Sequence, residues 1–194
     1  MSQPVIDPLQ RSARLKQEAD FILQAVNLYP ILQPYGRITP TGSYYLGVMI
    51  YPDIDLYLSP VSIEALFAIG SQLAACDLVF QVVFEKSQTT RLPGGLYLKP
   101  RIAYGEWGRP WKIDIWSLAD EVIDRQMAEI HRFKQAMTPE IRERIIRYKH
   151  AILTASQRTP MYSGYHICKA FIDEGLTDFQ AVTAYLIGQG IRMS

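Results

Sequence analysis

Cysteine is scarce in this sequence, which holds only Cys76 and Cys168 among its 194 residues. A zinc clip of the CxxC type needs two neighbouring thiols, so this distant pair excludes it. We interpret both as small apolar side chains of the core. The three histidines, His131, His150 and His166, fall on separate predicted helices without ligand spacing, so they predict no zinc site.

Long apolar runs are also missing. No stretch of about 18 residues stays apolar without a charge, and we therefore predict no membrane-spanning helix. The start of the chain lacks the apolar stretch of about 7–15 residues that marks a secretory signal. We expect a cytoplasmic protein with no membrane partner.

Neither sign of charge dominates, because 20 Lys and Arg stand against 19 Asp and Glu, a net charge of +1. This balance excludes a strongly basic nucleic-acid coat protein and an acidic disordered tail. It disfavours nucleic acid as a partner and leaves it as an open alternative. Between Arg125 and Arg158, eight basic residues accompany three acidic ones. This local excess either steers phosphates or RNA or forms a solvated helix face.

Hydrophobic spacing predicts an α+β fold: a mixed sheet flanked by helices, with a C-terminal helical region. A first helix begins after an N-cap at Asp7 and runs to about Leu28. The five expected strands are 36–41, 54–58, 78–84, 95–104 and 110–116. One helix, 62–75, interrupts them, and residues 105–108 form a hairpin turn before the last strand.

Helical spacing takes over after Ser117, which we predict to cap the next helix. Another helix begins at Thr138-Pro139-Glu140, and two short helices follow over about 165–174 and 177–188. We therefore divide the chain into two parts, a core of residues 1–118 and a C-terminal helical region of residues 119–194.

Three acidic residues interrupt apolar strand sequences. Asp53 and Asp55 lie in Pro-Asp-Ile-Asp-Leu, and Asp114 lies in Lys-Ile-Asp-Ile. Since side chains alternate along a strand, Asp53 and Asp55 share one face. Buried carboxylates repel one another unless a cation compensates them, and Mg²⁺ prefers such oxygen ligands. Two alternatives stay open: Asp53 is a turn residue after Pro52, or Asp114 forms an ion pair with an arginine, namely Arg37, Arg101 or Arg109.

A phosphate-binding pattern precedes the carboxylates. Thr41-Gly42-Ser43 closes a strand, where a glycine lets the backbone approach a ligand and the serine hydroxyl meets a phosphate. The order of these motifs resembles that of the polymerase-β-type nucleotidyltransferase superfamily. It consists of Gly-Ser, nine intervening residues, Asp-x-Asp on the next strand and a lone Asp on a later strand. The resemblance covers roughly residues 36–118. Thr41 departs from its pattern, which has a hydrophobic residue before the glycine.

The resemblance implies a set of roles. Asp53 and Asp55 would hold Mg²⁺ against the phosphates of a nucleoside triphosphate, and Gly42 and Ser43 would cradle the triphosphate. Asp114 would complete a site for a second Mg²⁺ or act as general base. Two ions would then clamp the attacking and leaving oxygens.

Two lysines extend this predicted site. Lys112 shares the strand face of Asp114 and contacts a phosphate or is a solvated lysine. Lys149 would be a triphosphate-binding lysine of the kind that relatives supply from their helical region. Ser43 also has a structural interpretation, as the cap of a turn. The three tryptophans either stack on a base or acceptor ring or pack in the core, which we favour: Trp107, Trp111 and Trp116.

The implied function is transfer of a nucleoside monophosphate, AMP from ATP, to a hydroxyl of a small-molecule acceptor, with release of pyrophosphate. The acceptor would bind between the sheet and the C-terminal helices. Two alternatives stay open. One is nucleotidylation of a protein or RNA, of the toxin–antitoxin type, and the other is a non-catalytic nucleotide-binding module. The sequence does not predict the acceptor or the oligomeric state.

Overall fold

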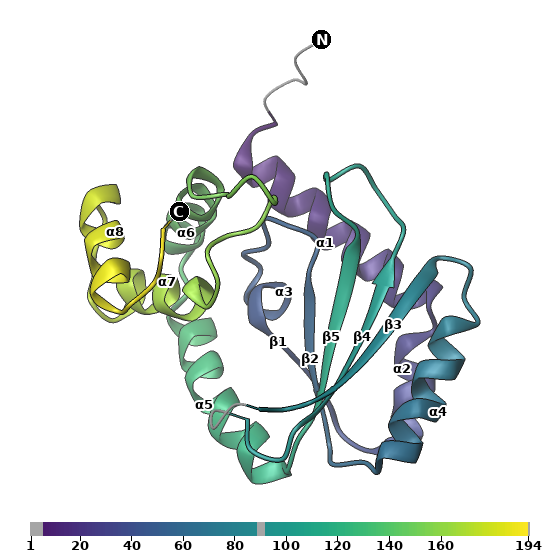
Figure 1. Ribbon diagram of the computed structural model, residues 1–194. Coiled ribbons are helices and arrows are strands. Elements are labelled where there is room, and N and C mark those ends of the chain that lie inside the picture. The colour runs from purple at the N-terminus through teal and green to yellow at the C-terminus, as the bar shows by residue number, and fades with distance from the viewer. Residues whose placement is uncertain (1–5, 89–91, 194) are drawn as a thin grey trace.

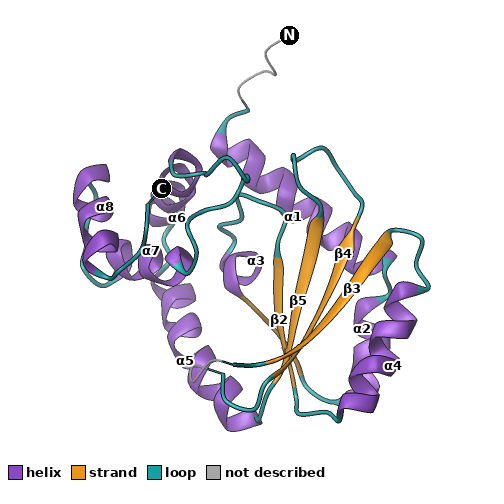
Figure 2. Ribbon diagram, viewed as in Figure 1, coloured by secondary structure: helices purple, strands orange, loops and turns teal. Residues whose placement is uncertain are grey.

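The computed structural model describes residues 6–88 and 92–193 and confirms the α+β class (Figures 1 and 2). Its helices and strands, in chain order, are α1 Pro8–Ala25, α2 Leu28–Leu32, the 3₁₀ turn Gln33–Tyr35, β1 Ile38–Thr41, α3 Gly42–Leu46, β2 Ile54–Leu58, α4 Ile63–Ala74, β3 Val79–Lys86, β4 Leu96–Ile102, β5 Trp111–Ser117, α5 Asp120–Ala136, α6 Pro139–Ala151, α7 Ser163–Ile172 and α8 Phe179–Gly188.

The five strands form one mixed sheet in the order β1-β2-β5-β4-β3. Strands β2 and β5 are parallel, and the other neighbours are antiparallel. The parallel pair needs a long connection, which α4, β3 and β4 supply. The predicted hairpin turn joins β4 to β5 as expected.

Helices cover the two faces of the sheet differently. On one face, α1, α2 and α4 pack against the apolar side chains of β2 and β5, such as Leu56 and Ile113, which are fully buried. On the other side, α5 to α8 form a helical layer with its own core (Figure 1). The end of α3 and the segment that follows it contribute Leu46, Val48 and Ile50 to that second core. No helix of the described chain is long and apolar enough to cross a membrane.

Several predicted element ends are confirmed. The carboxylate of Asp7 caps α1, and the hydroxyls of Ser62 and Thr138 cap α4 and α6. The first helix is shorter than predicted, because Asn27 takes a left-handed conformation and separates α1 from α2. The division of the chain at residue 118 stays a prediction.

The predicted cap at Ser117 is wrong. Helix α5 begins three residues later, and its N-cap Ala119 offers no side-chain hydrogen bond. The buried Ser117 ends β5 instead, where its hydroxyl donates to the carbonyl of Ser59 over 3.2 Å and accepts the N–H of Val61 over 2.9 Å. Because these groups bond to a distant strand end, no local pattern could reveal them.

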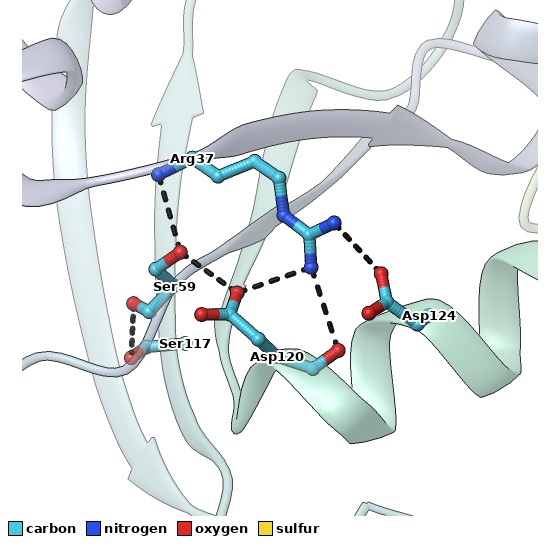
Figure 3. Close-up of polar contacts among 5 residues, drawn as sticks. All are labelled: Arg37, Ser59, Ser117, Asp120 and Asp124. Carbon is cyan, nitrogen blue, oxygen red and sulfur yellow. Dashed lines mark hydrogen bonds and ion pairs between the residues drawn. The ribbon is translucent and has the colours of Figure 1, made fainter.

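The first turn of α5 is tied to the sheet by the residues of Figure 3. The Arg37 guanidinium pairs with Asp120 at 3.1 Å and with Asp124 at 2.7 Å. The Ser59 hydroxyl donates to Asp120 over 2.9 Å and accepts the backbone N–H of Arg37. Exposed ion pairs stabilise weakly, so their effect is mainly to fix where α5 leaves the sheet.

We expect Ser117→Ala to destabilise the protein by about 1–3 kcal/mol, since it removes both hydrogen bonds of the buried Ser117 hydroxyl and leaves the partly buried N–H of Val61 without an acceptor. Urea unfolding measures the change. Ser71→Ala, at an exposed position inside α4, is the control and should change stability by less than about 0.5 kcal/mol. Equal effects of the two substitutions would contradict this role of Ser117.

Candidate active site

Strand pairing brings the three predicted carboxylates together. Asp55 of β2 lies directly beside Asp114 of β5 in the parallel register, and Asp53 comes just before β2. One ligand oxygen from each of the three lies within 4.8 Å of the others. Their apolar neighbours Ile113 and Ile115 point to the opposite, fully buried face. The cluster therefore follows from the strand alternation that the sequence shows.

The three carboxylates of the cluster repel one another when they are ionised. Burial raises the pKa of Asp53 from 3.8 to about 6, against the opposing charge of Lys112. Burial raises the pKa of Asp55 as well, and the charges of Asp53 and Asp114 add to the rise. Three carboxylates this close favour a bound cation.

Two of the three arginines left open as alternative partners of Asp114 have other partners. Arg37 pairs with Asp120 and Asp124, as Figure 3 shows, and Arg101 hydrogen-bonds to Gln81.

Lys112 is the cation that Asp114 contacts. Its ammonium donates a hydrogen bond to Asp114 Oδ2 and lies 3.0 Å from Asp53 Oδ1. The hydroxyl of Tyr97 on β4 donates to Asp114 Oδ1 over 2.6 Å. Burial and the charge of Asp114 raise the pKa of Tyr97, so Tyr97 stays a donor. Sequence reasoning missed Tyr97, whose strand carries no distinctive motif.

The donor set fits a magnesium ion. Its ligand atoms are carboxylate oxygens, which Mg²⁺ prefers. Asp53 Oδ1 is buried and makes no hydrogen bond of good geometry in the described chain, although the Lys112 ammonium is near. Such an atom retains capacity for a further cation.

The Thr41-Gly42-Ser43 segment lies against the carboxylates. Gly42 has a φ of +62°, and a Cβ there would lie 2.2 Å from Asp55 Oδ2, so only glycine fits this approach. The segment does more than close a strand as predicted, since Gly42 begins the short helix α3.

Lys149 reaches the same place from α6. Its buried ammonium donates to the hydroxyl of Ser43 and to the carbonyl of Val48, both over 2.7 Å. Burial lowers the pKa of Lys149 to about 8, which the charges of Asp53 and Asp55 oppose. Lys149 is one of the predicted site residues, but no spacing rule predicts its contact with Ser43.

A cavity of about 600 Å³ lies over these groups. Five predicted site residues line it: Gly42, Ser43, Asp53, Asp55 and Lys149. Lys112 and Asp114 are not among its lining residues in the described chain. Residues of α5, α6 and α7 also line the cavity.

Other lining residues escaped the sequence analysis. Tyr57 shares the strand face of Asp55, two positions away, and that spacing could have revealed it. Arg125 and Arg158 lie at the two ends of the segment with excess positive charge, and both line the cavity. Tyr162 also lines it, from a left-handed backbone conformation that no pattern predicts.

Two of the three tryptophans pack in the core, and the third lines the cavity. Trp111 is fully buried, and Trp107 is nearly so and donates its indole N–H to Glu18 over 2.6 Å. These two pack in the core, as we favoured. Trp116 lines the cavity and stacks on Tyr97, with 4.4 Å between ring centroids. It therefore stays available for a ligand ring.

We expect Gly42→Ala to destabilise the protein far more than Gly47→Ala. Both glycines have positive φ on or beside α3, and the left-handed conformation alone costs roughly 1–2 kcal/mol for alanine. A Cβ at Gly47 meets nothing within 4 Å, whereas one at Gly42 overlaps Asp55. Thermal unfolding of both variants isolates this overlap, and equal losses would refute it.

We also expect the metal-free protein to lose stability relative to Asp53→Asn as the pH rises from about 4 to 6. The raised pKa of Asp53 means that the folded protein keeps a proton that the unfolded chain releases. Stability then falls as pH rises through this interval. Urea unfolding in a chelator measures the difference. A wild-type curve that instead rises relative to the variant would show that the pKa of Asp53 is not raised.

Comparisons with known proteins add little to this picture. Neither a family model nor a curated protein matches the sequence. Among solved structures, the chain is similar to Cid1 in complex with the UTP analog UMPNPP, with a TM-score of 0.44 and 13% identity. The match covers 79% of this chain and 46% of that one, so the chain spans about half of its length. This similarity assigns no family.

Proposed function

We propose that the protein is a magnesium-dependent nucleotidyltransferase. It moves a nucleoside monophosphate, AMP from ATP, to a hydroxyl of a small-molecule acceptor and releases pyrophosphate. One observation carries the proposal: the carboxylates Asp53 and Asp55 line the same cavity as Gly42, Ser43 and Lys149. A cation site and a phosphate site side by side are what a metal–nucleotide complex requires.

The chain's own residues hold the donor. Asp53 and Asp55 bind Mg²⁺, and Asp114 contributes the third negative charge of the cluster. A bound Mg²⁺ would neutralise charge at the phosphates and act there as a Lewis acid.

On the phosphate side, Ser43 and Lys149 already contact each other over 2.7 Å. A phosphate oxygen can accept a third hydrogen bond from the lysine, because an ammonium carries three donors and Ser43 and Val48 accept two of them. Gly42 allows the backbone to lie against the metal-binding carboxylate. Adjacent residues thereby hold the metal ion and the triphosphate.

The size of the cavity favours a small acceptor. Its volume of about 600 Å³ falls within the range of about 300–1,000 Å³ typical of small-molecule sites. Tyr57 and Trp116 offer aromatic surfaces, and Glu129 offers a carboxylate, to an acceptor seated beside the donor.

One observation favours RNA as a second class of acceptor. Arg125 and Arg158 line the cavity, and they belong to the segment with excess positive charge. Guanidinium groups in these positions would contact backbone phosphates.

A thermal-shift series tests the donor site. ATP, GTP, CTP and UTP are each added with and without Mg²⁺ to the wild type, Asp53→Asn and the control Asp77→Asn, an exposed carboxylate outside the cavity. A nucleotide at about 100 times its Kd adds about 2.7 kcal/mol, or about 5–10 °C for a chain of this size. We expect this rise for ATP with Mg²⁺ in the wild type and Asp77→Asn, and its loss in Asp53→Asn.

Radiolabelled transfer then separates the classes of function. We expect label from the α-phosphate of ATP on a member of a small-molecule panel, with release of pyrophosphate. Label on RNA or protein alone would move the function to the alternative acceptors. Nucleotide binding without transfer to any acceptor would indicate a binding module, and no thermal shift with any nucleotide would refute the proposal.

A further inference from the structure

Asp114 differs from the other two carboxylates in its contacts. Each of its oxygens already accepts a hydrogen bond, Oδ1 from the Tyr97 hydroxyl over 2.6 Å and Oδ2 from the Lys112 ammonium. It is 8% exposed and does not line the cavity in the described chain. These two hydrogen bonds compete with a cation or a substrate proton for the oxygens of Asp114.

The ammonium of Lys112 lies between two carboxylates, Asp53 and Asp114. Lys112 lies two residues before Asp114 on β5, so both side chains leave the same face of the strand. Its ammonium contacts Asp114 and lies 3.0 Å from Asp53. A second metal ion shared by Asp53 and Asp114 would have to occupy this space.

The charges of the cluster agree with one ion. Asp53, Asp55 and Asp114 together carry three negative charges when ionised. Before a nucleotide adds its own negative charges, the ammonium of Lys112 and one divalent ion together carry three positive charges, whereas two divalent ions beside the same ammonium would carry five. The excess would be repelled across a distance of a few ångströms.

We propose that Lys112 takes the place of a second divalent cation, so that the site binds one Mg²⁺, through Asp53 and Asp55. Asp114 is then a positioning residue that holds the ammonium, together with Tyr97. This inference rests on the proposed function, because it assumes that the cluster binds Mg²⁺ at all. It departs from the two ions that the resemblance to the nucleotidyltransferase superfamily implies.

The cavity gives the single ion its place. Asp53 and Asp55 line the cavity, whereas Lys112 and Asp114 lie outside its lining in the described chain. An ion held by the first two is therefore next to Gly42 and the Ser43–Lys149 pair, where the phosphates would lie. The ammonium stabilises the cluster from the side away from the nucleotide.

Counting bound ions tests the inference. Mn²⁺ replaces Mg²⁺, and electron paramagnetic resonance measures the number bound per chain, with and without a non-hydrolysable ATP analogue. We expect one ion in the wild type and two in Lys112→Met, which removes the charge and keeps the length of the side chain. Lys16→Met is the matched control, since Lys16 also pairs with a carboxylate, Asp20 at 2.6 Å, but outside the cavity. It should bind one ion.

The alternative counts have separate meanings. Two ions in the wild type would overturn the role of Lys112 and leave the proposed function intact. No bound ion would overturn the proposed function together with this inference. One ion in Lys112→Met would show that the ammonium does not take the place of a cation.

Stability without substrate gives a second readout. In a chelator, Lys112→Met should lose several degrees of thermal stability relative to the wild type, because three carboxylates then lack their counter-charge. Added Mg²⁺ should restore most of this loss and shift the wild type much less. Lys112→Arg, which keeps the charge, should behave as the wild type. A loss in Lys112→Met that Mg²⁺ does not restore would contradict the inference.

Discussion

The parallel pairing of β2 with β5 is the constraint on which the site depends. In this register Asp55 lies beside Asp114, and the apolar residues that alternate with them along the strands, such as Ile54 and Ile113, face α1, α2 and α4. A shift of one residue would turn the carboxylates into the apolar core and the isoleucines out of it. Packing of the core therefore fixes the sheet face on which the carboxylates lie, and the register places Asp55 beside Asp114.

The same constraint creates an electrostatic cost that the protein compensates in two ways. Lys112 and Tyr97 lie on strands of the sheet, and they donate a hydrogen bond to each oxygen of Asp114. Asp53 and Asp55 keep raised pKa values and open onto the cavity. The sheet thus separates a carboxylate with both oxygens hydrogen-bonded from two that open onto the cavity.

The sequence predicts those features that depend on local periodicity. Alternation around Asp55 identified β2 with its exact bounds, and it identified the shared face of the carboxylates. Contacts between distant segments could not be predicted in this way. Arg37 meets Asp120 across 83 positions, and Ser117 bonds to the end of β2 instead of capping α5. Tyr97 is an ordinary strand tyrosine until the sheet order places β4 beside β5.

Lys149 connects the two predicted parts of the chain at the point where they would share a ligand. It comes from α6, 106 positions after Ser43, yet it is 1% exposed and bonds to the segment before β2. A buried ammonium is costly, and its lowered pKa reflects that cost. An anionic ligand beside Ser43 would relieve it. The helical region is therefore more than a cover of the cavity, because it supplies a charge that the sheet alone lacks at this position.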